Sequence, residues 1–490
     1  MRRIKIFLCM LFALGVFCTL IPAHADISSV KYVHDTIVTL KNIDVPIPAG
    51  ISASNVNNVR YLLAMIDAAN YKIGNPTNYA SSPAALPNVV AAAKASSDID
   101  TLIVYPQKFY VTVSAAAAFS FKISASGTFY VDWGDGTAFQ TITKPDTTQT
   151  TYSYTFKTTG AHVISIWGKA TGYNTNTQIA AISFENETRA FTIAGNLGHI
   201  FPTLGDGPGL QPSFYFIFRM ASGLSGQLPA GMFDGLSGTL VDYMFADIFN
   251  GTKISGTIPP NLFGDMRGGY AYGMYQSAFY NCTGLTGSIP AGLFGHLAGP
   301  AQPYIFANTF YGCTGLTGEI PAGLFGDPTG APGINMFIGT FYTDAGLTGS
   351  IPPGLFGHLN GPAQAKMFNN TFYQCTGLTG SVPAMLFGTF TGAAQDSMFS
   401  GTFYQDRGLT SIDPGIWDLT GMTNTATIAT PFQTMFQGCT SIAGVPAPTI
   451  AAGNTTNLWT KFSNMTATTI ATFKNVTGLT NYANIPAGWK

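Results

Sequence analysis

Cysteines recur at one position of a repeated sequence, which makes these thiols the first candidates for chemistry. The stretch CTGLTGSIPAGLFG begins at Cys282 and returns as CTGLTGEIPAGLFG from Cys313. Later copies place at the same position Asp344, Cys375, Asp406 and Cys439. Paired strands of neighbouring copies would lie about 4.8 Å apart, so Cys282 and Cys313 could form a disulfide, whereas Cys375 and Cys439 could not. We favour four reduced, partly buried thiols.

Metal binding by these cysteines is not expected. A column of thiols does not converge on a metal ion, and no CxxC or HxxxH spacing exists.

Histidines and carboxylates give little support for catalysis. Five histidines lie beyond residue 25 of the chain: His34, His162, His199, His296 and His358. His296 and His358 occupy equivalent repeat positions, with Asp327 between them in the column, so they follow the repeat and not a catalytic site. No GxSxG, paired-carboxylate or phosphate-loop motif stands out. We therefore expect a protein that is not an enzyme and that needs no cofactor.

A period of about 31 residues dominates the C-terminal part of the chain. A proline after a short apolar stretch recurs at intervals of 30 to 32 residues, and of 40 before the last copy. These prolines are Pro229, Pro259, Pro290, Pro321, Pro352, Pro383, Pro414, Pro446 and Pro486. Such self-similarity predicts a solenoid, in which identical units stack on one another and no unit folds alone.

The pattern within one repeat predicts how each coil forms. In MFIGTFYTDAGLTGSIPPGLFG, Phe337 and Phe341 are four residues apart, which favours a short helical turn with both rings facing inward. Leu347 and Ile351 then flank a short extended segment, and Pro352 ends it because proline lacks a ladder donor.

Three aromatic columns recur with the same period and would bury against one another. About five large apolar groups per coil contribute roughly 1.5–3 kcal/mol each, whereas ordering one residue's backbone costs about 1–2 kcal/mol, so a lone coil is unstable and stacking is obligatory. The columns are Phe245, Tyr275, Phe306, Phe337, Phe368 and Phe399; Phe249, Phe279, Phe310, Phe341, Phe372 and Phe403; and Phe263, Phe294, Phe325, Phe356 and Phe387.

The repeat resembles a known family. TFYGCTGLTGEIPAGLFG and TFYQCTGLTGSVPAMLFG are similar to the BspA-like leucine-rich repeats of bacterial surface proteins, and LTGSIP is similar to plant leucine-rich repeats. The resemblance covers roughly residues 196–490. It implies a leucine-rich-repeat-like solenoid of about nine coils with terminal caps over 188–490. Two features depart from the family: the repeat exceeds the usual 20–29 residues, and Phe replaces Leu at most core positions.

Residues 106–187 show a different period. In GTFYVDWGDGTAF, apolar and polar residues alternate before a tight turn at Asp135 and Gly136, which predicts short strands of a β-sandwich. VDWGDGT, with YSYTF and TTGAHVISI downstream, resembles a polycystic kidney disease (PKD) type domain, an immunoglobulin-like sandwich of secreted and surface proteins. Asp132 and Asp135 could be calcium ligands, but two carboxylates are too few to hold calcium alone, so we favour a turn-stabilising role.

The N-terminal residues predict export. A basic start, an apolar run from Ile6 to Ile21 and the small-x-small pattern ending at Ala25 indicate a signal peptide over 1–25. A lipoprotein reading of Cys18 is disfavoured because the preceding Phe17 is bulky. No later stretch is apolar enough for a transmembrane helix.

Between the predicted signal peptide and the predicted sandwich, residues 26–105 read as a small helical segment and linker. The apolar residues of one stretch fall on one helical face, which predicts packing or spacing rather than a binding site. They are Val56, Val59, Leu62, Leu63 and Ile66.

Composition restricts the partners. The 490 residues hold 22 Lys+Arg and 23 Asp+Glu, only 9% of the chain, so no basic surface is available for nucleic acid. The first hypothesis is an extracellular or cell-surface protein that binds host or neighbouring-cell protein or glycan through the solenoid. Alternatives are a self-assembling structural protein of the cell envelope and the binding module of a secreted glycan-active enzyme. Candidate ligand-binding residues are Tyr280, Asn281, Tyr311, Tyr373 and Gln374.

Overall fold

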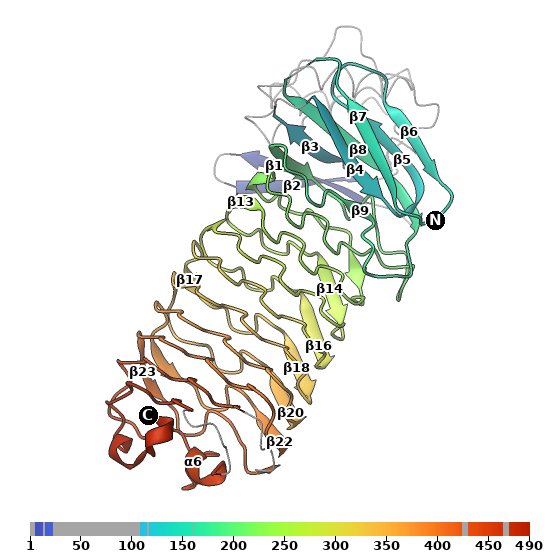
Figure 1. Cartoon of the computed structure of the whole chain (residues 1–490). Coiled ribbons are helices and arrows are strands. Elements are labelled where there is room, and N and C mark those ends of the chain that lie inside the picture. Colours follow the sequence, from blue (N-terminus) through green and yellow to red (C-terminus); the bar gives the residue numbers. More distant parts are fainter. Residues whose placement is uncertain are drawn as a thin grey trace.

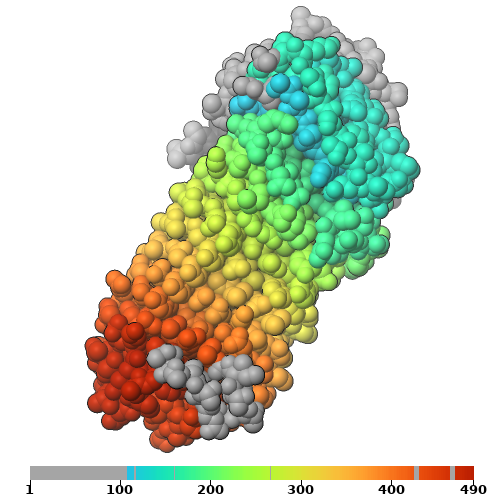
Figure 2. All heavy atoms as spheres, viewed as in Figure 1, coloured from blue at the N-terminus to red at the C-terminus, as the bar shows by residue number. Residues whose placement is uncertain are grey.

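The protein forms an elongated rod with a β-sheet domain at one end and a capped coil stack at the other (Figure 1). The computed structural model describes residues 108–114, 117–158, 160–423, 430–463 and 470–490, together with two strands near the N-terminus. The predicted helical segment 26–105 lies outside these described residues. In Figure 2 the colours pass steadily from green to red along the rod, so successive coils follow one another along its axis.

The two N-terminal strands are β1 (Lys5–Phe12) and β2 (Gly15–Pro22), which pair antiparallel as a hairpin. Cleavage after Ala25 stays a prediction and would remove both strands. Among the residues that the structure describes, none belongs to a helix with the length and apolar character needed to span a bilayer.

Two antiparallel sheets make up the N-terminal domain. The five-stranded sheet has the order β10-β3-β8-β5-β6, and the three-stranded sheet has the order β7-β4-β9. The strands are β3 (Phe109–Val113), β4 (Ala118–Ile123), β5 (Ser126–Asp132), β6 (Gln140–Lys144), β7 (Thr150–Thr155), β8 (His162–Gly172), β9 (Ile182–Ser183) and β10 (Phe191–Gly195).

Aromatic side chains fill the space between the two sheets. Phe121 of β4 contacts Trp133, which directly follows β5, with ring centroids 5.7 Å apart. Phe109 of β3 meets Phe184 at 5.9 Å. These residues are fully buried, as expected when alternate residues of each strand face a common core.

Residues 225–423 form a β-solenoid of about seven turns, in which each coil contributes two short strands. One side is a seven-stranded parallel sheet of β12 (Ser237–Gly238), β14 (Asp265–Gly268), β16 (His296–Pro300), β18 (Asp327–Gly330), β20 (His358–Pro362), β22 (Thr389–Ala393) and β24 (Met422–Thr423). A second side carries β11 (Ser225–Gln227), β13 (Lys253–Gly256), β15 (Gly284–Leu285), β17 (Gly318–Glu319), β19 (Leu347–Thr348), β21 (Gly380–Val382) and β23 (Leu409–Ile412), also paired in parallel. The expectation of coils joined by paired extended segments is thus confirmed.

A third side, which we call the turn face, consists of overlapping turns with no helix. Every fourth residue has a left-handed φ, for example 58° at Gly273, 52° at Ser277 and 57° at Asn281. Successive backbone amides alternate between acceptors in the next coil and acceptors in their own coil. The N–H of Phe279 donates to the carbonyl of Thr309 in the next coil at 2.9 Å, whereas the N–H of Cys282 donates to the carbonyl of Phe279 in its own coil at 3.0 Å. The predicted helical turn was therefore wrong, because the left-handed residues interrupt the helix and half of the amides bond between coils.

The predicted inward face of this segment is confirmed despite the different backbone. The turn pattern repeats every four residues, so Tyr275 and Phe279 both point into the core and are fully buried. The three aromatic columns are also confirmed. Consecutive ring centroids lie 5.5–5.8 Å apart in the first column, 5.4–5.6 Å in the second and 6.0–6.1 Å in the third.

Both ends of the solenoid are covered. At the N-terminal end, Phe191 of β10 bridges to Leu224 and Phe184 stacks on Phe218, so one continuous hydrophobic core runs through the sheet domain and the coils. At the other end, the N–H of Phe473 donates to the carbonyl of Trp489, so the last residues close the turn face. The cap contains α6 (Leu458–Lys461), η1 (Tyr482–Asn484) and η2 (Ala487–Trp489). The last sequence repeats thus belong to the cap, and the regular coils number about seven rather than nine.

A glycine on the turn face gives a first prediction. Gly401 has φ 63°, and a Cβ there would collide with the side chain of Asn370 in the preceding coil. Gly323 has a similar φ of 67° but open space around it. Gly323→Ala is expected to cost about 1–2 kcal/mol of unfolding free energy through backbone strain alone, and Gly401→Ala more than that. Urea unfolding of both variants checks this expectation, and equal losses would contradict it.

Candidate binding surface

The most regular feature at the surface is a column of stacked, partly buried tyrosines on the turn face, which we call the tyrosine ladder. Its ring centroids are 4.3–4.6 Å apart, with interplanar angles between 3° and 16°. The predicted residues Tyr280, Tyr311 and Tyr373 all belong to it. Two further members were missed although the sequence FY marks them in the same column. The ladder consists of Tyr280, Tyr311, Tyr342, Tyr373 and Tyr404.

Because the tyrosine rings of the ladder stack on one another, only some of their atoms are accessible to a ligand. Each inner ring has a tyrosine on both faces, so its edge and hydroxyl are what it can present to a ligand. All five side chains are partly buried. Burial, and then the neighbouring phenols, raise the pKa of Tyr311 and of Tyr373 to about 12. Tyrosine hydroxyls are protonated at neutral pH even at their ordinary pKa of about 10, so both can donate hydrogen bonds there, and the raised pKa extends this to alkaline pH.

The two predicted amide residues lie beside the ladder in left-handed conformations. Asn281 has φ 57° and is exposed, and Gln374 has φ 58°. The Nε2 of Gln374 donates to Oε1 of Gln405 at 3.1 Å, and Nε2 of Gln405 donates to the hydroxyl of Tyr404 at 3.2 Å. The structure thus brings all five predicted residues onto one face, as a row of phenol and amide groups.

The cysteine column lies inside the solenoid and away from this surface. All four thiols are free and buried. Each sulfur donates to a backbone carbonyl of the preceding coil, for example Cys313 to Phe279 at 3.0 Å and Cys375 to Phe341 at 2.8 Å. Burial raises the pKa of Cys282 to about 12, so this thiol is a poor nucleophile. The four thiols are free, as expected, but they are fully buried and not partly buried as predicted, because the column faces the packed interior of the coils.

Two carboxyl groups share the interior column with the cysteines. Asp344 and Asp406 are fully buried, and neither oxygen of either carboxyl has a hydrogen-bond partner. Burial raises the pKa of both groups well above its usual range. Sequence reasoning recognised both residues as members of the column but attached no consequence to them.

The histidines do not converge on a site. The Nδ1 of His358 lies 2.7 Å from Oδ1 of Asp327, and both side chains are exposed at the start of β20 and β18. His162 stacks on Phe156 in the sheet domain, at 3.9 Å between ring centroids. His34 lies outside the described residues. Within the part of the chain that the structure describes, no three His, Cys, Asp or Glu residues form a group able to hold a metal ion.

Asp132 and Asp135 stabilise the turn after β5. Oδ1 of Asp132 accepts the N–H of Gly134 at 2.9 Å. Oδ1 of Asp135 accepts the N–H of Thr137 at 3.1 Å, and its Oδ2 accepts the hydroxyl of Tyr154 at 2.6 Å. Both carboxylates are engaged in local hydrogen bonds, which supports the turn-stabilising interpretation over the calcium one.

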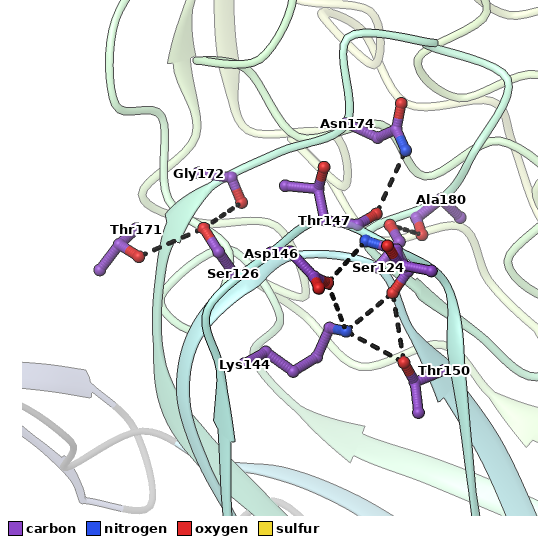
Figure 3. A network of polar contacts seen from close by, with 11 residues as sticks. Ser124, Ser126, Lys144, Asp146, Thr147, Thr150, Thr171, Gly172, Asn174 and Ala180 are labelled. Carbon is purple, nitrogen blue, oxygen red and sulfur yellow. Dashed lines mark hydrogen bonds and ion pairs between the residues drawn. The ribbon is translucent and has the colours of Figure 1, made fainter.

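The sheet domain also contains a buried lysine, drawn in Figure 3. The Nζ of Lys144 donates to the carbonyl of Thr148 at 2.7 Å and to the hydroxyl of Thr150 at 3.1 Å, and it pairs with Asp146 at 3.4 Å. These contacts tie together the connection between β6 and β7. The ammonium is fully satisfied within this loop and is no candidate for chemistry.

The tyrosine ladder and its flanking amides are therefore the candidate functional surface. Their regular spacing follows from the coil repeat, because every rung occupies the same position of its coil. In comparisons with known proteins, no family model, no curated protein and no solved structure matches this chain.

Proposed function

We propose that this chain is an exported, non-enzymatic surface protein that binds protein or glycan ligands through the turn face of its solenoid. The observation that carries the proposal is the tyrosine ladder, a row of equivalent hydroxyls fixed on stacked coils. Identical weak contacts at regular spacing suit multivalent binding, in which several rungs engage one extended ligand. Rigid aromatic side chains also lose little entropy on binding.

The remaining parts of the chain fit the same proposal. The apolar run and Ala25 cleavage pattern would direct export, and the two-sheet domain with its VDWGDGT turn would act as a PKD-type stalk. The repeat would belong with the BspA-like leucine-rich repeats of surface proteins. Cell fractionation tests the export, and recovery of the full-length chain only inside the cell would contradict it.

Binding is tested with the purified full-length protein on arrays of extracellular-matrix proteins and glycans. The variant Tyr311→Ala/Tyr342→Ala/Tyr373→Ala removes three consecutive rungs and is expected to weaken binding about 100-fold, at about 1 kcal/mol for each contact. The matched control His296→Ala/Asp327→Ala/His358→Ala changes three exposed residues of the seven-stranded sheet in the same part of the solenoid, and is expected to bind normally.

Two outcomes would overturn the proposal. The first is equal binding by the wild-type protein and the ladder variant, since the turn face would then not be the binding surface. The second is ordered self-assembly of the wild-type protein with no ligand bound on either array, which would favour the structural role in the cell envelope.

A further inference from the structure

The tyrosine ladder lies in a strip of the turn face that carries no charge. The strip comprises five six-residue segments, one from each of five successive coils: 276–281, 307–312, 338–343, 369–374 and 400–405. None contains Asp, Glu, Lys, Arg or His. Charged residues of these coils lie outside the strip, as Lys366, Arg407 and the His358–Asp327 pair do.

The groups that the strip presents are hydroxyls and amides. Beside the ladder, the left-handed positions hold Asn281, Thr343, Gln374 and Gln405 on one side, and Asn308 and Asn370 on the other. Gly339 and Gly401 leave room for the side chains of Asn308 and Asn370 in the preceding coils. Phenol hydroxyls and side-chain amides, each able to donate and to accept hydrogen bonds, thus recur from coil to coil along the rod axis.

Three properties of this strip select among ligands. A charged polymer would find no counter-charge within the five segments of the strip, so nucleic acid and acidic glycans are disfavoured. A folded protein partner would need apolar anchor residues set in pockets, whereas the faces of the inner rings are already covered by neighbouring rungs. A polymer with repeated hydroxyls meets the same contacts at each rung, over roughly 19 Å for four steps of about 4.8 Å.

We propose that the strip binds an uncharged polysaccharide that lies along the solenoid axis and hydrogen-bonds to successive phenol and amide groups. This inference rests on the proposed function and narrows its ligand to one class. The tyrosine hydroxyls are the main specificity groups, because they are the polar atoms that the stacked rings carry. The stacked rings also hold these hydroxyls in register with one another.

The test measures binding of the full-length protein to soluble polysaccharides by affinity electrophoresis and calorimetry. Hydroxyethyl cellulose, laminarin and dextran are the neutral probes, and heparin and alginate are the acidic ones. We expect saturable binding to at least one neutral probe, with an affinity that does not change between low and high salt. Tyr311→Phe/Tyr342→Phe/Tyr373→Phe keeps the stacking but removes three hydroxyls, and is expected to weaken binding by about ten-fold or more.

The control His296→Ala/Asp327→Ala/His358→Ala is expected to bind the neutral probe like the wild-type protein. Salt-sensitive binding to the acidic probes alone, or neutral binding that the Tyr→Phe variant leaves unchanged, would overturn the inference. Ladder-dependent binding to a protein array with none to any neutral probe would overturn this inference and leave the proposed function intact. No binding to any probe or array would overturn both.

Discussion

Replacing Phe325 by alanine is expected to lower the free energy of unfolding by about 3–5 kcal/mol. Phe325 is fully buried and lies where the aromatic columns meet. Its ring centroid is 4.5 Å from that of Phe306 and 5.1 Å from that of Phe337. The cavity would open between coils that have no independent core, so neighbouring coils would lose packing as well. Urea unfolding of the full-length protein, followed by circular dichroism, measures the loss.

Two further variants serve as comparisons for the alanine variant at Phe325. Phe325→Leu keeps an apolar side chain in the column and is expected to lose less than half as much stability as the alanine variant. Met385→Ala removes a side chain that is 43% exposed, and should change stability by no more than about 0.5 kcal/mol. A loss at Phe325 as small as that at Met385 would mean that the columns do not hold the coils together.

Replacing Asp344 and Asp406 by cysteine is expected to stabilise the protein at neutral pH. Each aspartate places an unpartnered carboxyl in the core, at a cost of about 1–3 kcal/mol. Cysteine restores the group that neighbouring coils use, whose sulfur donates to a backbone carbonyl. Because both carboxyls lie next to the coil of Cys375, each single variant is measured beside the double variant. Unfolding is measured under reducing conditions to keep all thiols free.

The same substitutions should change how stability depends on pH. The pKa of each buried carboxyl is raised in the folded state, so between about pH 4 and that raised pKa the folded protein binds more protons than the unfolded chain. The contribution of these two carboxyls to stability should therefore be fully present below about pH 4 and fall as pH rises toward the raised pKa. The double cysteine variant should lose the part of this fall that Asp344 and Asp406 cause, while Asp247, whose pKa burial raises to about 6, keeps its own part.

Asp396→Asn is the control for this pH dependence, because Asp396 is exposed. It should keep the wild-type pH profile. The account of the buried carboxyls fails if the cysteine variant and the wild-type protein have parallel profiles, or if the cysteine variant is the less stable at neutral pH.

Periodicity predicted the solenoid well because the burial of large side chains depends on spacing more than on backbone detail. Phe337 and Phe341 point inward whether the segment is helical or built from turns, since both conformations bring residues four apart onto one face. The turn conformation itself could not be predicted. Its left-handed positions include Lys366 and Thr343, residue types that give no local signal for positive φ.

Some members of the tyrosine ladder could be predicted from the sequence, because they recur with the same period as the buried phenylalanines. Tyr280, Tyr311 and Tyr373 stand out as polar aromatic residues beside buried phenylalanines, but their mutual stacking depends on the coil spacing. The unpartnered state of Asp344 likewise depends on the surrounding coils. A sequence can place a residue in the interior column without showing that its neighbours offer no hydrogen bond there.

Disulfide trapping on the tyrosine ladder tests the coil stack most directly. Strand-paired coils lie about 4.8 Å apart, within the range of about 4.4–6.8 Å that a disulfide requires between Cα atoms, whereas two coils span about 9.6 Å. Mild oxidation of the full-length Tyr311→Cys/Tyr342→Cys variant should therefore give an intramolecular disulfide, seen by mass spectrometry. Tyr311→Cys/Tyr373→Cys should leave both thiols free. Bond formation in both variants, or in neither, would contradict a solenoid in which residues 31 apart lie side by side.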